Sequence, residues 1–186
     1  MTKWEVDDVL NSMIVLVDTR EQPTDRARRR YQTFGCGYRR ATLAYGDYTY
    51  NYQNKTGKWR YDENETISPD IMIERKMNLD ELARCFAQDR DRFIREMERA
   101  KAAGADIYLI VEGATWENLI NGKYRSRFNA KAYFASIVAW QIRYSMKVIF
   151  CKPDTSGTII KEILFRKLKE KLESKDRCKD IQVPNT

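Results

Sequence analysis

Histidine is absent from the 186-residue chain, and its absence excludes several classes of enzyme. Ser-His-Asp and Cys-His triads, zinc sites with imidazole ligands and nucleases that use imidazole as general base all require it. Any catalysis by this chain must therefore come from carboxylates, lysine, arginine, tyrosine or a thiol.

Cysteine and long apolar runs are also scarce. The four cysteines form no C-x-x-C pair, which argues against a zinc knuckle. No apolar run approaches the ~20 residues of a membrane-spanning helix, and the N-terminus lacks the cationic-then-apolar pattern of a signal peptide. We therefore expect reduced thiols, a cytoplasmic protein (nucleoid-associated if bacterial or phage) and no membrane partner.

Charge is abundant and unbalanced. The chain has 34 Lys and Arg against 27 Asp and Glu, a net charge of +7. A basic surplus favours a polyanionic partner such as nucleic acid. The length fits about one domain. We place that domain at residues 13–173, with an N-terminal arm or short helix at 1–12 and a polar tail at 174–186.

Predicted strands alternate with predicted helices along the chain. Apolar and β-branched runs predict strands at residues 13–17, 41–51, 70–76, 106–111 and 146–151. Three-four spacing predicts helices at 78–104, 130–144 and 158–172, and a short helix is expected after residue 25. Asn78 is the predicted N-cap of the first of these three, and Gly104 follows its end. Residues 53–68 indicate a hairpin or long loop. The alternation indicates an α/β layer fold with a mostly parallel sheet.

One strand combines acidic and basic side chains on one face. Because side chains alternate along a strand, Glu74 and Lys76 point to the same face, and Ile73 and Arg75 to the other. Asp47, from a neighbouring strand, would bring a second carboxylate. Hard divalent cations such as Mg²⁺ bind one or two carboxylates together with waters and substrate phosphate. Lys76 would then orient or help to deprotonate an attacking water, or stabilise transition-state charge.

Three segments in order carry a specific resemblance. They are Val17-Asp18-Thr19-Arg20-Glu21, Gly46-Asp47-Tyr48 and the run Glu74-Arg75-Lys76-Met77-Asn78-Leu79-Asp80. Together they resemble the nuclease domain of the XPF family of excision-repair endonucleases, within the PD-(D/E)XK superfamily. The resemblance implies a restriction-endonuclease-like α/β fold with a central mixed sheet flanked by helices. It also implies a Mg²⁺- or Mn²⁺-dependent DNA endonuclease that cuts branched, flap or fork DNA in repair or recombination.

The resemblance also assigns roles to residues. Asp47 and Glu74 would be the principal metal ligands, with Asp18 as a further metal ligand and Lys76 as the catalytic lysine. Arg20 and Glu21 would line the site, and Arg75 would support it. Asp80 would be either an acidic neighbour of the metal or an orienting residue for Lys76 or an arginine.

Phosphate contacts are expected from two basic segments. The candidate DNA-binding residues are Arg28, Arg29, Arg30, Arg39 and Arg40 in the first, and Lys123, Arg125 and Arg127 in the second. In the second segment aromatic residues interleave with the cations, which suits stacking on an unpaired base. Binding through such contacts would depend strongly on salt.

Several expectations concern partners. The chain after residue 172 is too short for a tandem helix-hairpin-helix domain, and no helicase segment is present, so a separate protein would supply DNA targeting. The helices at 130–144 and 158–172 offer faces for a homodimer, or ordinary core. Two alternatives to a flap-type endonuclease are a non-catalytic DNA-binding or partner subunit, and a junction-resolving or restriction-type nuclease of the same superfamily.

Overall fold

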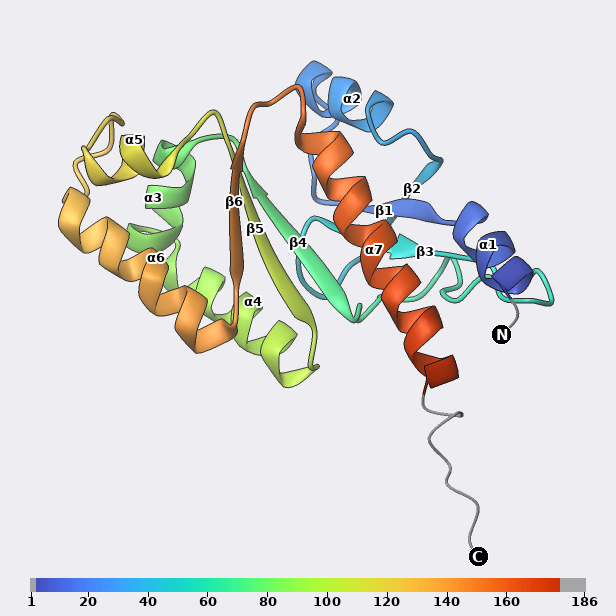
Figure 1. The fold of residues 1–186 in the computed structure, drawn as a ribbon. Coiled ribbons are helices and arrows are strands. Elements are labelled where there is room, and N and C mark those ends of the chain that lie inside the picture. The colour runs from blue at the N-terminus through green and yellow to red at the C-terminus, as the bar shows by residue number, and fades with distance from the viewer. Residues whose placement is uncertain (1–2, 178–186) are drawn as a thin grey trace, which may run out of the picture.

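A six-stranded sheet forms the centre of the computed structural model, which describes residues 3–177 (Figure 1). Its strand order is β2-β1-β3-β4-β5-β6. The strands are β1 Ile14–Asp18, β2 Tyr38–Ala41, β3 Tyr48–Asn51, β4 Ile71–Lys76, β5 Asp106–Glu112 and β6 Lys147–Cys151. The sheet is mixed, because β3 runs antiparallel to both β1 and β4 while the other neighbouring pairs are parallel.

The single strand expected at residues 41–51 is wrong. Val17 of β1 pairs with Arg40 of β2 on one side and with Tyr48 of β3 on the other. One extended strand cannot pair with both edges of the same neighbour, so the chain must turn between Ala41 and Tyr48. This turn brings Gly46 and Asp47 to the edge of the sheet where β1 and β4 end.

Helices cover both faces of the sheet (Figure 1). One face carries α3 Leu79–Ala87, α4 Arg90–Ala102, α5 Trp116–Ile120 and α6 Ala130–Tyr144, packed in one apolar cluster. The other carries α1 Lys3–Asn11, α2 Asp25–Gln32 and α7 Ser156–Arg177, packed in a second cluster. Among residues 3–177, no helix is long and apolar enough to cross a membrane.

The helix expected at 78–104 is divided in two. Its predicted start is confirmed, since the side chain of Asn78 accepts the N–H of Glu81 at 2.9 Å, and so is its end before Gly104, which has φ +68°. The break falls at Gln88 and Asp89, where two successive N–H groups turn back to the carbonyl of Arg84. No glycine or proline marks this break, and the apolar spacing continues across it, so the sequence predicted a single helix.

The two long helices that follow differ in what they leave exposed. On α6, Ile142 is 79% exposed and Phe134 37%. On α7, the apolar side is buried in the domain's own core, together with Val6, Val9 and Leu10 of α1. The α7 face is therefore not a free surface for dimerisation, and residues 3–11 form a packed helix. Of the expected polar tail at 174–186, residues 174–177 belong to α7 and 178–186 lie outside the described residues.

Candidate active site

The strand β4 divides the expected motif between the two faces of the sheet. Glu74 and Lys76 share one face and are nearly buried, with exposed fractions of 4% and 7%. Nζ of Lys76 donates to Oε1 of Glu74 at 2.5 Å and lies 5.4 Å from the ring centre of Phe93 on α4. Arg75 points to the opposite face, where it contacts Glu21. The alternation expected from the sequence is confirmed.

Asp47 is held beside these two residues by backbone contacts. Because β3 is antiparallel to β4, the residue before β3 lies near the end of β4. The N–H of Asp47 donates to the carbonyl of Ile73 at 2.9 Å, and its Oδ2 accepts the N–H of Arg75 at 2.7 Å. Gly46 has φ +76°, and a Cβ there would approach Cβ of Met72 to 2.9 Å, so this turn requires glycine.

The two carboxylates and the ammonium group perturb each other's protonation. Burial, reinforced by the charge of Glu74, raises the pKa of Asp47 to about 8. Burial also raises the pKa of Glu74, although Lys76 opposes this. Burial disfavours the charge of Lys76, but Glu74 and Asp47 more than offset it, so the pKa of Lys76 lies above its ordinary value. Lys76 is therefore a fixed cation at neutral pH.

Asp47 and Glu74, called the acid pair below, fit a divalent cation. Within the described residues, no hydrogen bond reaches Oε2 of Glu74, which is buried, or Oδ1 of Asp47. An unpaired buried carboxylate oxygen is costly, and a cation would satisfy it. Residues 3–177 hold no cluster of three or more potential metal-binding side chains. The pair therefore fits the kind of site in which two carboxylates are completed by waters and a phosphate.

Asp18, expected as a further ligand, has other partners. Its buried carboxylate accepts the N–H of Arg20 at 2.7 Å, Nε of Arg20 at 2.6 Å and the N–H of Leu43 at 2.9 Å. Both oxygens are already hydrogen-bonded, so the structure places Asp18 as the anchor of the segments that follow β1 and β2. Arg20 lies beside it, exposed, with Nη2 3.8 Å from Glu96.

Glu21 and Arg75 belong to a buried ionic network behind the acid pair. Oε1 of Glu21 accepts Nη2 of Arg75 at 2.8 Å and Nη1 of Arg30 at 3.1 Å. Nε of Arg30 also donates to Oε1 of Glu112 at 2.9 Å. Although burial opposes ionisation, the hydroxyl of Ser156 and the charge of Arg30 hold the pKa of Glu112 below its ordinary value. Glu21 and Arg75 thus support the edge of β4 from the other face.

Three of the expected DNA contacts are engaged within the protein. Arg30 is 2% exposed, so its predicted place on a DNA-binding surface is wrong. Arg39 pairs with Glu63 at 3.2 Å, and Nη2 of Arg40 donates to the carbonyls of Thr19 and Glu21. A run of basic residues does not distinguish DNA contacts from contacts within the protein, because sequence alone does not show which arginines on α2 and β2 face inward.

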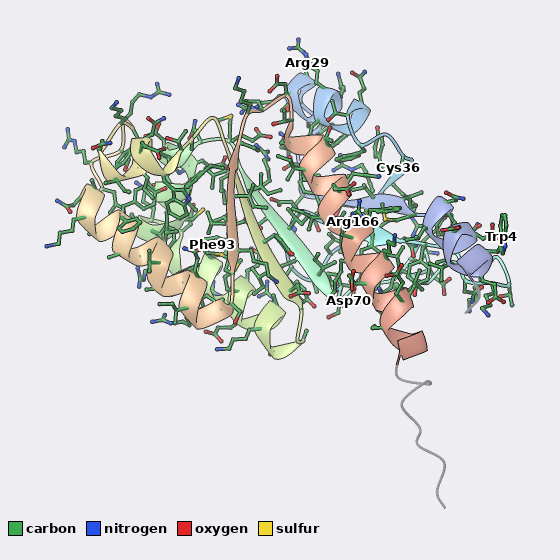
Figure 2. All side chains as sticks on the ribbon, viewed as in Figure 1. Trp4, Arg29, Cys36, Asp70, Phe93 and Arg166 are labelled. Atoms are coloured by element: carbon green, nitrogen blue, oxygen red, sulfur yellow. The ribbon has the colours of Figure 1, made fainter. Side chains whose placement is uncertain are left out.

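Two arginines of the first basic segment remain exposed. Arg28 makes an exposed ion pair with Asp25 at 3.2 Å. Arg29 lies on the outer side of α2 and points away from the sheet (Figure 2). The basic surface of α2 is therefore smaller than the sequence indicated.

The second basic segment is attached to the site by Asp80. Oδ1 of Asp80 accepts the N–H groups of Arg125 and Ser126. The cations of this loop are exposed, whereas Tyr124 and Phe128 pack against Tyr133, with ring centres 5.4 and 5.1 Å apart. Because both rings pack edge-on against Tyr133 and are half-buried, their stacking on a base stays a prediction.

Sequence reasoning missed Glu96 and Arg84. Oε1 of Glu96 accepts the N–H of Gly46 at 2.9 Å, next to Asp47. Its signal was available, since Glu96 follows Phe93 by three residues and so lies on the buried side of α4. Arg84 lies one helical turn after Asp80 and lines the same clefts.

Two clefts adjoin at Asp80, Arg84 and Arg125. One, of about 510 Å³, extends from Arg20, Arg75 and Met77 to these three residues. The other, of about 720 Å³, continues from them to Arg127 and Phe128. A trough therefore runs from the end of β4 to the loop at 122–128, lined by several arginines together with Glu21, Asp80 and Glu81.

Comparisons with known proteins agree with the fold and with the family that the sequence resembles. The model of the ERCC4 domain matches residues 17–163. The structure is similar to that of XPF from Aeropyrum pernix, with a TM-score of 0.58 and 19% identity, covering 88% of this chain and 69% of that one. It is also similar to XPF from Aeropyrum pernix in complex with DNA, with a TM-score of 0.54 and 20% identity, covering 88% and 66%. No curated protein matches the chain.

Proposed function

The chain belongs to the ERCC4-domain family, and on that basis we propose that it is a Mg²⁺- or Mn²⁺-dependent endonuclease that hydrolyses phosphodiester bonds in branched, flap or fork DNA. Family membership supports the coarser assignment, a structure-specific DNA endonuclease. The observation that carries the finer one is the acid pair: Asp47 and Glu74 each keep a carboxylate oxygen without a hydrogen bond, beside the cationic Lys76.

The proposed mechanism gives each residue a separate task. Asp47 and Glu74 would hold the cation, which would neutralise phosphate charge and lower the pKa of a bound water. Glu74 also holds the ammonium group of Lys76 in place. Because Lys76 stays protonated, it suits the stabilisation of charge on the phosphate oxygens better than proton abstraction. Of the roles expected for Lys76, charge stabilisation is the one that we propose.

DNA as the substrate is supported by the trough. Its arginines extend from the end of β4 to the loop at 122–128, so they would contact phosphates of DNA that continues beyond the site. The preference for branched, flap or fork DNA is proposed from family membership. Homodimerisation is a further proposal, and it rests on the exposed Ile142 and Phe134 of α6.

A cleavage panel tests the proposal. Labelled flap, fork, four-way and linear duplex DNA are incubated with Mg²⁺, Mn²⁺ or EDTA. We expect cleavage of flap or fork DNA with either metal and none with EDTA. Asp47→Ala and Lys76→Ala should each lose at least about a hundredfold in rate. Asp91→Asn removes an exposed carboxylate on α4 and is the matched control.

Three outcomes would overturn parts of the proposal. Full metal-dependent cleavage by Lys76→Ala would refute the catalytic assignment. Equal cleavage of linear duplex would refute the preference for branched DNA and favour a restriction-type nuclease. DNA binding without cleavage of any substrate would favour a non-catalytic subunit.

A further inference from the structure

Asp80 makes contacts that a metal neighbour would not need. Its Oδ1 accepts two consecutive main-chain N–H groups, those of Arg125 and Ser126, both at 2.7 Å. Its Oδ2 lies 3.7 Å from Nε of Arg125. Asp80 stands in the first turn of α3, four residues after Lys76 in the chain. The carboxylate of Asp80 therefore joins α3, the helix that follows β4, to a loop more than forty residues later in the sequence.

The loop at residues 122–128 is two-sided. Its inward side chains are fixed: the hydroxyl of Tyr124 donates to the carbonyl of Phe128 at 2.8 Å, and both rings pack against Tyr133. Its outward side chains are the cations, and the side chain of Arg125 is 92% exposed. Lys123 and Arg127 are exposed as well. Three cations in five residues thus face solvent in a fixed order, which suits an anionic partner.

The loop also forms one wall of the arginine-lined trough. Arg125 lines both clefts, while Arg127 lines the one farther from β4. Arg84 completes the wall from α3. The position of these cations relative to the acid pair therefore depends on the attachment of the loop to Asp80.

From this geometry we propose that Asp80 is a positioning residue for substrate. Its carboxylate holds the loop at 122–128 so that Lys123, Arg125 and Arg127 contact the phosphates of DNA bound at the acid pair. The proposal rests on the proposed nuclease function and deepens it. It gives the last acidic residue of the motif a role in DNA binding, separate from metal binding by Asp47 and Glu74.

Salt dependence of DNA binding is the decisive measurement. Affinity for a labelled duplex-containing flap is measured in EDTA, without cleavage, over a series of salt concentrations. Each lost phosphate contact lowers the slope of log affinity against log salt by about 0.9. Asp80→Ala should lower the slope by about two to three such contacts and weaken binding roughly tenfold or more at moderate salt. Asp80→Asn keeps an oxygen acceptor for both N–H groups, so it should keep the wild-type slope.

A second set of variants separates a local effect from general destabilisation. In the background of Lys123→Ala, Arg125→Ala and Arg127→Ala together, Asp80→Ala should cause no further loss of DNA affinity, because the residue acts through those cations. In cleavage, Asp80→Ala should raise KM and leave kcat close to wild type. All assays are run below the melting temperature of the least stable variant.

The outcomes distinguish this inference from the proposed function. A wild-type slope for Asp80→Ala, or an equal loss of affinity when the loop cations are already removed, overturns the positioning role alone. A loss of kcat at unchanged KM also overturns the positioning role and indicates that Asp80 acts in the chemical step. Wild-type protein that binds no DNA overturns both proposals.

Discussion

A buried carboxylate, that of Glu74, beside the half-buried carboxylate of Asp47 is an unfavourable arrangement for a protein without a cation. Burial raises the pKa of both Asp47 and Glu74, and the charge of Glu74 raises that of Asp47 further. Lys76 compensates one negative charge, and the second remains to be neutralised by a proton or by a metal. Such a conflict between folding and charge is expected at a functional site rather than in a structural core.

This conflict predicts the effect of Asp47→Asn. The folded-state pKa of about 8 lies above the ordinary value, so the unfolded chain releases this proton first as the pH rises. Stability of the metal-free protein should therefore fall between about pH 4 and pH 8. Asp47→Asn keeps the acceptor for Arg75 and removes the charge, so it should gain roughly 0.5–2 kcal/mol at pH 8 and less at pH 5.

Urea denaturation in EDTA measures this gain, with Asp91→Asn as the control. Mn²⁺ should raise the melting temperature of the wild type, since it binds the folded state, and should not raise that of Asp47→Asn. An Asp47→Asn variant that loses stability at pH 8, or that still responds to Mn²⁺, would contradict the assignment of Asp47.

For individual residues, the sequence predicted the shared face of Glu74 and Lys76 better than the contacts of the residues around them. Alternation along a strand is a local rule, so the shared face of Glu74 and Lys76 followed from spacing alone. The partners of Asp18 and Asp80 are main-chain N–H groups on other segments, and these cannot be inferred from spacing. The burial of Arg30 likewise depends on Glu112, which lies 82 residues away in sequence.

Among the secondary-structure elements, α2 is held to the sheet by charge as well as by apolar contact. Arg30 reaches Glu112 on β5 and Glu21 after β1, and also lies 3.3 Å from the hydroxyl of Ser156 at the start of α7. Burying an ion pair brings little net stability, whereas removing one partner leaves a buried charge uncompensated. The network therefore fixes how α2 and α7 meet the edge of β4.

Arg30→Met tests this account of α2. With Glu112 left buried and partly unpaired, the variant should lose about 3–5 kcal/mol of stability. Arg29→Met, one residue earlier on the exposed side of α2, should change stability by less than about 0.5 kcal/mol. Adding Glu112→Gln to Arg30→Met should recover part of the loss.

Denaturant unfolding of the wild type, Arg30→Met, Arg29→Met and the Arg30→Met, Glu112→Gln double variant measures these changes in stability. If Arg30→Met were as stable as Arg29→Met and weakened DNA binding instead, Arg30 would belong to the DNA-binding surface after all.

Elements were predicted from sequence where periodicity alone defines them. The strand β5 and the helix α6 follow their apolar spacing closely, whereas α7, expected at 158–172, begins at Ser156 and continues to Arg177. The separation of β2 from β3 depends on both pairing with β1, and the break between α3 and α4 on packing of Phe86 and Phe93 around Trp140. Both are tertiary effects that leave no period in the sequence.

Across the whole molecule, acidic side chains at the end of β4 differ in their contacts and pKa shifts from those at the start of β4 and β5. At the end of β4, Asp47 and Glu74 each keep one carboxylate oxygen without a hydrogen bond, and their pKa values are raised. At the start of β4 and β5, Asp70 and Asp106 are paired with lysines of α7, and their pKa values are lowered. Asp70 lies between β4 and α7 (Figure 2), where it pairs with Lys171 and Arg60. The first edge is suited to binding a cation, and the second closes the fold.

The closing edge predicts how the molecule responds to acid. Although burial opposes its ionisation, Lys171 and Arg60 hold the pKa of Asp70 at about 2, below the ordinary 3.8. This stabilisation is therefore present above about pH 4 and is lost as the pH falls toward 2. Because the pair is partly exposed, Asp70→Asn should cost about 1–2 kcal/mol at pH 6 and almost nothing near pH 2. Denaturant unfolding from pH 2 to pH 6 in EDTA measures this, with Asp91→Asn as control; a cost that does not depend on pH would mean that Asp70 contributes by packing and not by charge.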